Sequence, residues 1–311
     1  MPTDLTGSIM QQERFLPKTE HALTAAEDID IEASDSVLRR LLRSQEGAVA
    51  AVERALGAIE QAALAAADTL GGGDGRLVYV GAGTSGRIGV QDGAELSPTF
   101  GWPAHRLVLL IAGGMTALTE AVENAEDDSA AAMAAIAQHA IGPADVVIGL
   151  AASGGTPYTL AALAAAAARG ACTIAVSNAA GGAILSACRH PVLIETGAEV
   201  IAGSTRLAAG TAQKITLNLF STLLMIRLGH VYRGLMVDML PRNEKLRGRA
   251  VRMLQSLSRA EPAAIIAALD ATSWQIKEAL LVLHGVSATE AKARLARHGG
   301  HLRPALAELG A

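Results

Sequence analysis

Short apolar runs and longer helical stretches alternate through the middle of the chain. Five runs rich in Val, Ile and Leu are separated by segments of helical composition, and these runs are continuous rather than alternating with polar residues. Strands of this kind are typical of a parallel sheet that helices cover on both faces. The pattern predicts strands over residues 76–81, 106–114, 145–153, 172–178 and 190–196.

Helical segments are predicted between and around these strands. Apolar residues at helical spacing run from 34 to 70, and the mostly apolar stretch 210–231 predicts a long buried helix. Beyond residue 240 every segment has helical character, including two short helices around Gly299 and Gly300. Further helices are predicted over residues 85–97, 115–127, 128–140 and 156–170.

These elements predict an α/β fold with a doubly wound, mostly parallel sheet. The expected arrangement is a three-layer, flavodoxin-like sandwich with an N-terminal helix and a small C-terminal helical domain. A chain of 311 residues is long enough for one large core of this type and a smaller appendage. The predicted boundaries are 1–60 for an N-terminal arm and helix, 61–235 for the sheet domain and 245–311 for the helical domain.

Composition and charge narrow the classes of function. The net charge is −4 without any run of like charges, so binding to nucleic acid or to an anionic membrane is not expected. The two cysteines, Cys172 and Cys188, belong to no CxxC pair or Cys/His cluster, which argues against a disulfide scaffold or a zinc site. Because no signal-like segment or uninterrupted apolar span is evident, we expect a cytoplasmic protein.

Glycines and hydroxyl side chains follow three of the predicted strands. The segments are GAGTSGR after the first strand, AASGGTPY after the third and GSTR after the fifth. Ligands bind at the carboxyl ends of strands in open parallel sheets, and helix N-termini at that edge attract phosphate. The candidate phosphate-binding residues are Thr84, Ser85, Gly86, Ser153, Gly154, Thr156, Ser204 and Thr205.

Nucleotide-binding motifs fit these loops less well. GAGTSG has the G-x-G-x-x-G spacing, but no acidic residue follows a second strand about twenty positions on, where a ribose would need it. The chain also lacks a Walker motif. The remaining alternative is that the loops are only turns and helix caps, a common role of Ser, Thr and Gly. Three such loops at one sheet edge favour a phosphomonoester held by hydroxyls and backbone amides.

Motifs in a characteristic order extend from about Thr19 to near the C-terminus. They include GAGTSGR, AELSPTFG, IAGG, ENAEDD, AASGGTPY, GAEVIAGSTR, AGTAQK, LMVD, NEKL and EAKARLARHGG. In this order the chain resembles the N-acetylmuramic acid 6-phosphate etherases, a family with a sugar isomerase-type (SIS) phosphosugar-binding domain that is related to the glucokinase regulatory protein. The resemblance implies a lyase that removes the D-lactyl ether by elimination and hydration, giving D-lactate and N-acetylglucosamine 6-phosphate in the recycling of cell-wall amino sugars.

Two glutamates lie in the most specific of these motifs. An elimination needs a base for the C2 proton and an acid for the departing oxygen, and two carboxyls can supply both, so no metal or other cofactor is expected. The resemblance implies Glu95 as the acid toward lactate and Glu126 as the base at C2. Glu123 is an alternative to Glu126 because it lies three residues earlier on the same predicted helical face. Taken alone, ENAEDD is more typical of a solvated acidic patch.

Glu199 and Lys214 complete the candidate substrate-binding set. Glu199 follows the fifth strand and could contact a sugar hydroxyl, and Lys214 could pair with the phosphate, although ordinary surface roles are equally open to both. Three positions depart from motifs common in the family: Leu23 replaces Asn, Gly155 replaces Arg and Ala208 replaces Lys. These departures leave the elimination chemistry intact but put the identity of the substrate's substituents in question.

Two other classes of function share the hydroxyl-bearing loops. A non-catalytic phosphosugar sensor would bind a sugar phosphate and regulate a partner, and an aldose–ketose isomerase would convert a phosphosugar without releasing an acid. The presence of both glutamates favours the lyase. The resemblance also implies that the strand-end loops lie at a subunit interface, so we expect a homodimer with contacts from the apolar helix 211–228 and the N-terminal helix.

Overall fold

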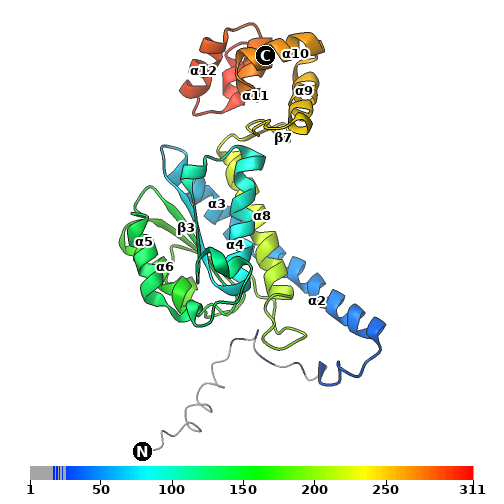
Figure 1. The fold of residues 1–311 in the computed structure, drawn as a ribbon, viewed down its shortest axis with the longest axis vertical. Coiled ribbons are helices and arrows are strands. Elements are labelled where there is room, and N and C mark those ends of the chain that lie inside the picture. Colours follow the sequence, from blue (N-terminus) through cyan, green and yellow to red (C-terminus); the bar gives the residue numbers. More distant parts are fainter. Residues whose placement is uncertain (1–16, 18, 20, 22, 24–25, 311) are drawn as a thin grey trace, which may run out of the picture.

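The centre of the molecule is a five-stranded sheet with helices on both faces (Figure 1). The computed structural model describes residues 17, 19, 21, 23 and 26–310. Much of the beginning of the predicted N-terminal segment 1–60 therefore lies outside the described residues. Among the helices that are described, none is both long enough and apolar enough to cross a bilayer.

All pairings within the sheet are parallel, and the strand order is β2-β1-β3-β4-β5. Leu77 of β1 is in register with Leu107 of β2 and with Val146 of β3. This order is that of flavodoxin-like sandwiches, and it confirms the predicted fold class. The strands are β1 Leu77–Gly81, β2 Leu107–Ile111, β3 Val146–Ala151, β4 Cys172–Ser177 and β5 His190–Leu193.

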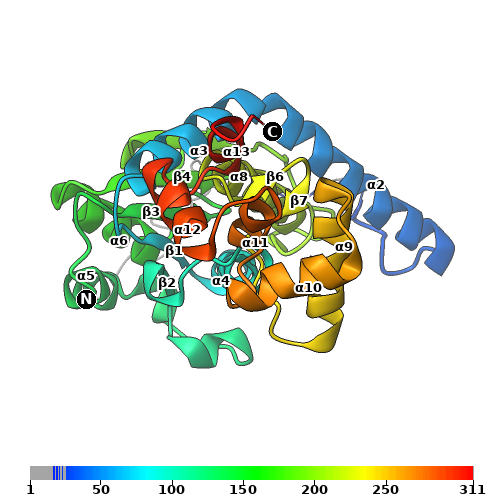
Figure 2. The ribbon, with the colours of Figure 1, turned by 90° about the horizontal axis from the view of Figure 1, so that it is seen from above.

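Helices form the two outer layers of the sandwich, as Figures 1 and 2 show. On one face of the sheet lie α3 Leu56–Leu70, α4 Gly83–Phe100 and α8 Ala208–Arg227, and α2 Ser34–Arg54 packs against α8. On the other face lie α5 Ser129–Gln138, α6 Pro157–Ala168 and the short helix α7 Ala183–Ser186.

Alternate residues of each strand enter two separate apolar cores. In β1, Leu77 and Tyr79 belong to the core shared with α3, α4 and α8, whereas Val78 and Val80 belong to the core shared with α5 and α6. All four side chains are at most 1% exposed. Burial on both faces explains why the strands lack a polar alternation.

The long helices end differently from the prediction. The helix predicted over 34–70 is interrupted at Ala55, whose ψ of −1° breaks the helical path, and so forms α2 and α3. The helix predicted over 210–231 begins two residues earlier and ends at Arg227, because Gly229 adopts a φ of 82° that a helix cannot continue through.

The helix predicted over 115–127 is wrong. The segment holds only two 3-10 turns, η4 Met115–Leu118 and η5 Ala125–Asp127. Asn124 has a φ of 59°, in the left-handed region, so a continuous helix is impossible there. A third such turn, η3 Ala104–Arg106, leads from α4 into β2.

A helical unit with an apolar core of its own follows the sheet unit. A small hairpin of β6 Val231–Tyr232 and β7 Leu235–Met236 leads into it. The helical tail is confirmed, including short helices on either side of Gly299 and Gly300, while the boundaries drawn at 61–235 and 245–311 stay predictions. The helices are α9 Glu244–Ser258, α10 Pro262–Ala271, α11 Ile276–Leu283, α12 Ala288–Arg297 and α13 Leu302–Ala307.

Candidate functional site

A cavity of about 510 Å³ opens at the carboxyl ends of the central strands, and we call it the strand-end cavity. It lies where the chain order reverses, between β1 and β3, which is the position at which open α/β sheets bind ligands. Five of the predicted hydroxyl residues and one predicted glutamate share this cavity. They are Thr84, Ser85, Ser153, Thr156, Thr205 and Glu126.

Two helices begin at the wall of this cavity without a side-chain cap. Neither Ala82, before α4, nor Thr156, before α6, caps its helix with a side-chain hydrogen bond. The N–H groups in the first turns of both helices are therefore available to a ligand, apart from Pro157 at the start of α6, which has no N–H, and the positive ends of two helix dipoles point to the same place. Among the described residues that line the cavity there is no Lys or Arg. A phosphate here would be held by N–H groups and hydroxyls rather than by a cation.

Gly86 and Gly154 shape the loops and are not among the residues that line the cavity. A Cβ on Gly86 would lie 2.8 Å from the carbonyl oxygen of Gly81, so α4 could not approach β1 as closely with any other residue. Gly154 has a φ of 72°, and a Cβ there would lie 2.6 Å from the Cα of Gly182. Ser204 likewise falls outside the cavity, although its neighbour Thr205 lines it.

Glu126 reaches the strand-end cavity from the turn η5. Asn124 reverses the chain just before this turn, and the Asp128 carboxylate accepts a hydrogen bond of 2.8 Å from the N–H of Ala131 at the start of α5. Glu123 does not line the strand-end cavity; it lines two neighbouring cavities, and Glu126 also lines one of these. The expectation that Glu123 and Glu126 share a helical face is wrong because the segment is not a helix.

Glu95 lies in a different place from Glu126. Together with Lys214 it lines a separate hollow of about 280 Å³ between α4 and α8, here called the α4–α8 hollow. Ser85 and Glu95 are ten residues apart on α4, so about 15 Å of helix separates them. Carboxyl pairs that act on one sugar ring in glycosidases lie only about 5 to 9.5 Å apart. Within one described chain, Glu95 and Glu126 do not form one site.

A buried carboxylate that the sequence analysis missed organises the α4–α8 hollow. Asp92 is 6% exposed and accepts hydrogen bonds from the Tyr79 hydroxyl (2.7 Å), the Asn218 amide (2.8 Å) and the Ser221 hydroxyl (3.2 Å). Burial raises the pKa of Tyr79 well above its ordinary value, and the Asp92 charge raises it further. Asp92 thus ties α4, α8 and β1 together one turn before Glu95. Asp92 lies three residues before Glu95 and therefore on the same face of α4; this spacing is the sequence signal that could have indicated its place beside Glu95.

Glu199 caps a helix rather than lining the strand-end cavity. It is fully buried, and its two oxygens accept hydrogen bonds from the N–H groups of Ala208 (3.0 Å) and Ala209 (2.9 Å) at the start of α8. Its burial argues against the predicted contact with a sugar hydroxyl. Because Glu199 satisfies these N–H groups, the start of α8 is closed to an anion, in contrast to α4 and α6.

The three departures from the family pattern occupy different environments. Gly155 lines the strand-end cavity, and a Cβ at this position would meet no atom within 4 Å, so a side chain would extend into open space. Ala208 is buried at the capped start of α8, and Leu23 is exposed. Only Gly155 therefore changes the surface that a ligand would meet in the strand-end cavity.

Comparison with known proteins places this geometry in a family. Residues 57–167 match the model of the glucokinase regulatory protein N-terminal SIS domain. A relative from Deinococcus radiodurans, named N-acetylmuramic acid 6-phosphate etherase, is 49% identical, with 94% of this chain and 95% of the relative covered. Relatives of the same name from Rubrobacter xylanophilus (42%; 93% and 96% covered) and Edwardsiella ictaluri (43%; 93% and 97% covered) agree with it. The chain belongs to the N-acetylmuramic acid 6-phosphate etherase family.

Proposed function

We propose that this protein is a carbon–oxygen lyase that cleaves the D-lactyl ether of N-acetylmuramic acid 6-phosphate. The observation that carries the proposal is the strand-end cavity. It brings together two uncapped helix N-termini, the hydroxyl side chains of five Ser and Thr residues, and Glu126. Those N–H and O–H donors suit a phosphate ester, and a carboxylate beside them suits proton abstraction from the sugar. Relatives that carry the etherase name support the choice of reaction.

In the proposed elimination, Glu126 removes the proton from C2 of the sugar. The electron pair of that bond forms a C2–C3 double bond, and the C3–O bond breaks as an acid protonates the departing oxygen, which releases D-lactate. Water then adds at C3 while a proton returns to C2, and the product is N-acetylglucosamine 6-phosphate. The net change is the addition of one water across the ether bond, so it needs no oxidant or reductant.

We further propose that Glu95 of the partner subunit supplies the acid, in a homodimer. Within one chain the α4–α8 hollow and the strand-end cavity are separate, so Glu95 cannot reach a sugar held beside Glu126. In the dimer that we propose, two-fold packing through α8 and its neighbours would bring the hollow of one subunit to the strand-end cavity of the other. Lys214 would then enter the same composite site beside Glu95.

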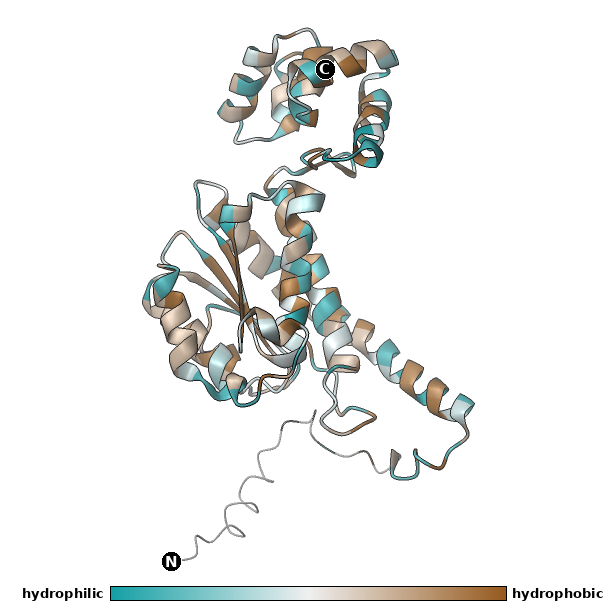
Figure 3. Cartoon of the chain, in the orientation of Figure 1, coloured by the Kyte–Doolittle hydropathy of each residue, from teal (hydrophilic) through white to brown (hydrophobic). Residues whose placement is uncertain are grey.

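Exposed apolar side chains on α2 and α8 support a dimer. Leu38, Leu42 and Val49 form one stripe along α2 and are 66%, 64% and 58% exposed. Leu219 and Ile226, seven residues apart on α8, are 41% and 42% exposed. Figure 3 shows hydrophobic residues along the part of α2 that extends away from the sheet unit. Apolar surface of this extent is typical of a protein interface.

The decisive experiment mixes two inactive variants, Glu95→Gln and Glu126→Gln. If each site uses one glutamate from each subunit, a mixed dimer has one intact site, and random exchange restores about a quarter of the wild-type lactate release. No recovery after verified subunit exchange would overturn the shared site but not the lyase. Full activity of the Glu126→Gln variant would overturn the role of Glu126.

A direct product assay separates the lyase from its alternatives. Release of D-lactate from N-acetylmuramic acid 6-phosphate supports the etherase. Tight binding of phosphosugars without lactate release would favour a sensor, and conversion of a phosphosugar without an acid product would favour an isomerase. The cytoplasmic location and the absence of nucleic acid among the partners stay predictions.

A further inference from the structure

The loop that connects β2 to α5, residues 112–128, carries Glu126 and has an irregular backbone. Three of its residues adopt a φ in the left-handed region, namely Gly113 (83°), Gly114 (70°) and Asn124 (59°). The helical elements of this fully described loop are the 3-10 turns η4 and η5. Because hydrogen bonds in short 3-10 turns are poorer than those of an α-helix, contacts with neighbouring elements have to fix the position of Glu126.

Arg87 of α4 anchors the first part of the β2–α5 loop. Its Nε donates a hydrogen bond of 2.8 Å to the carbonyl oxygen of Ala117, and its Nη2 donates one of 3.1 Å to the carbonyl oxygen of Glu120. Among the described residues, these are the hydrogen bonds that join α4 to the loop. A guanidinium can hold two carbonyl groups at once because its N–H groups form a rigid planar fork. Arg87 is also the last residue of the GAGTSGR motif, so one motif supplies both a wall of the strand-end cavity and this anchor.

Apolar contacts attach the same loop to the sheet. Ala117 is 6% exposed and packs with Val90 of α4 and Ile111 of β2. Val122 lies over Gly113, where a Cβ would come within 2.8 Å of the Val122 Cβ, so a side chain at this glycine would push Val122 away. These contacts do not involve the guanidinium, and we therefore expect the chain to fold when the guanidinium is removed.

Arg87 and Glu126 line one cavity of about 290 Å³. The start of α4, residues 82–84, and loop residues 120–126 line it too. Residues 82–84 and Glu126 also line the strand-end cavity, so the two cavities meet there. Because a cavity separates this stretch of loop from α4, the position of Glu126 depends on how the ends of the stretch are held. Arg87 holds one end, and Asp128, which caps α5, holds the other.

We propose that Arg87 is a positioning residue for Glu126. It fixes the β2–α5 loop to the helix whose N-terminus faces the strand-end cavity, and so sets the distance between a phosphate bound there and the carboxylate that removes the C2 proton. The inference rests on the proposed function, because it requires Glu126 as the base. Loss of the anchor leaves the N–H groups of α4 in place but releases Glu126.

A double-mutant cycle tests whether Arg87 acts through Glu126. Arg87→Gln should lower kcat for D-lactate release about 30-fold and change KM less than about threefold, since a misplacement of about 1 Å can cost about a hundredfold in rate. Exchange of the C2 proton with solvent deuterium should fall by the same factor. In the Glu126→Gln background, Arg87→Gln should lower the residual rate less than about twofold, because no base is left to position. Arg87→Lys keeps the charge without the planar fork and should stay at least about fivefold below the wild type in kcat.

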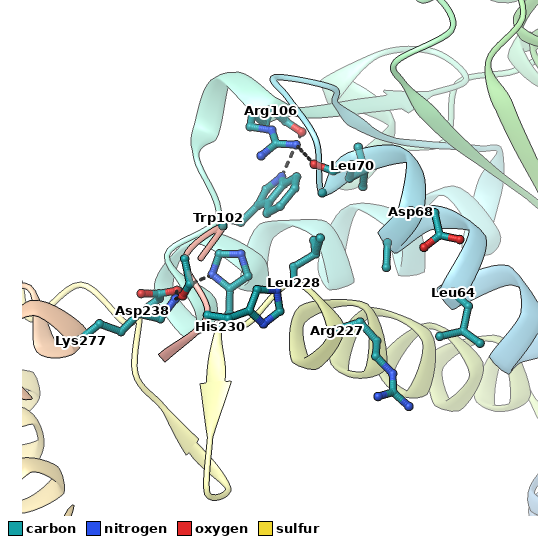
Figure 4. A pocket seen from close by; sticks show the side chains of 15 residues that line it. Leu64, Asp68, Leu70, Trp102, Arg106, Arg227, Leu228, His230, Asp238 and Lys277 are labelled. Atoms are coloured by element: carbon teal, nitrogen blue, oxygen red, sulfur yellow. Dashed lines mark hydrogen bonds and ion pairs between the residues drawn. The ribbon is translucent and has the colours of Figure 1, made fainter. Parts of the chain in front are cut away.

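Arg106→Gln is the matched control. Like Arg87, Arg106 donates to two backbone carbonyl oxygens, those of Gly75 (2.7 Å) and Leu70 (2.8 Å). Arg106 directly precedes β2, so it lies at the opposite edge of the sheet from the strand-end cavity, and Figure 4 shows it beside Trp102 and Leu70. Its substitution should leave kcat within about twofold of the wild-type value, because distant sites without shared partners act independently.

Amide hydrogen exchange tests the anchor without substrate. The N–H groups of Thr119, Glu120 and Asp127 donate hydrogen bonds within the β2–α5 loop, and their exchange reports local opening of the loop. Arg87→Gln should speed their exchange about fivefold or more, the effect of losing one net hydrogen bond. Arg106→Gln should leave their exchange unchanged.

Three results would overturn the positioning role. They are unchanged exchange of these N–H groups in Arg87→Gln, equal losses of kcat from Arg87→Gln with and without Glu126, and a wild-type kcat in Arg87→Lys. Failure of the wild-type protein to release D-lactate would instead overturn the proposed lyase. In that case hydrogen exchange would still decide whether Arg87 anchors the loop.

Discussion

The strand-end cavity and the junction between the sheet unit and the helical unit differ in the polar groups that they present. The first presents backbone N–H groups of two uncapped helices, hydroxyls and the carboxylates of Glu126 and Asp127. At the second, the Asp238 carboxylate pairs with Lys277 of α11 and lies 2.8 Å from Nδ1 of His230, which follows α8. Backbone dipoles bind a phosphate without bringing a counter-charge that could neutralise a nearby glutamate. The cation of Lys277, in contrast, pairs with Asp238 and so joins the helical unit to the segment that follows the sheet unit.

A matched pair of carboxylates tests this contrast most strongly. Glu126→Gln should lower kcat by about a thousandfold or more with little change in KM, because a positioned general base contributes about 10² to 10⁴ and glutamine cannot accept the proton. Glu123→Gln removes a neighbouring exposed charge and should change kcat less than threefold. The measurements are D-lactate release and, for proton abstraction at C2, exchange with deuterium from solvent. Equal losses in both variants would show that the acidic turn acts only through its overall charge.

The contacts of Asp238 with Lys277 and His230 should matter for stability rather than for turnover. Asp238→Asn leaves Lys277 and His230 without their carboxylate and should lower the free energy of unfolding by about 2 kcal/mol, less than a fully buried pair would because Asp238 is partly exposed. Denaturant unfolding followed by Trp102 and Trp274 measures this loss. Arg297→Gln, which breaks only exposed ion pairs with Glu290 and Glu308, is the control and should change stability by less than about 0.5 kcal/mol. Identical stability of both variants would contradict a bridging role for Asp238.

A cation added to the strand-end cavity would give it a charged side chain of the kind that its described lining residues lack. The space beyond Gly155 is open, so Gly155→Arg should fold normally and lower KM for the phosphosugar by about threefold, with a stronger salt dependence. Gly155→Gln is the control of similar length without charge. The substituted cation would prove irrelevant to phosphate binding if both variants had the same KM at low salt.

The pH dependence of stability is the smallest expected effect. The pKa of His301 is lowered in the folded protein, so the unfolded chain binds more protons as the pH falls below the ordinary histidine value. Stability should therefore fall between about pH 7 and pH 5.5 in a buffer without phosphate or carboxylate, and His301→Asn should flatten this part of the profile. An unchanged profile in His301→Asn would assign the dependence to other groups.

Much of the fold could be predicted because residues close together in the sequence form clear patterns of hydrophobic and polar positions. Continuous apolar runs in the sequence predict the buried strands, and the loops rich in glycine and hydroxyl residues indicate the ends of β1 and β3. The prediction of a helix over residues 115–127 is wrong. The segment has a helical composition, but Asn124 adopts a left-handed conformation that the sequence pattern does not indicate. The local pattern also placed Glu199 near a ligand, whereas its burial and the two N–H groups of α8 make it a cap.

The sequence by itself determined the parallel sandwich, the helical tail and the family, since periodicity and motif order are properties of neighbouring residues. Only the tertiary structure showed that Thr84, Ser153, Thr205 and Glu126 share one cavity while Glu95 does not. Only it joined Asp238 to Lys277 and His230. Distances between side chains far apart in the chain depend on how the layers pack and where the strand order reverses, and no local pattern records that.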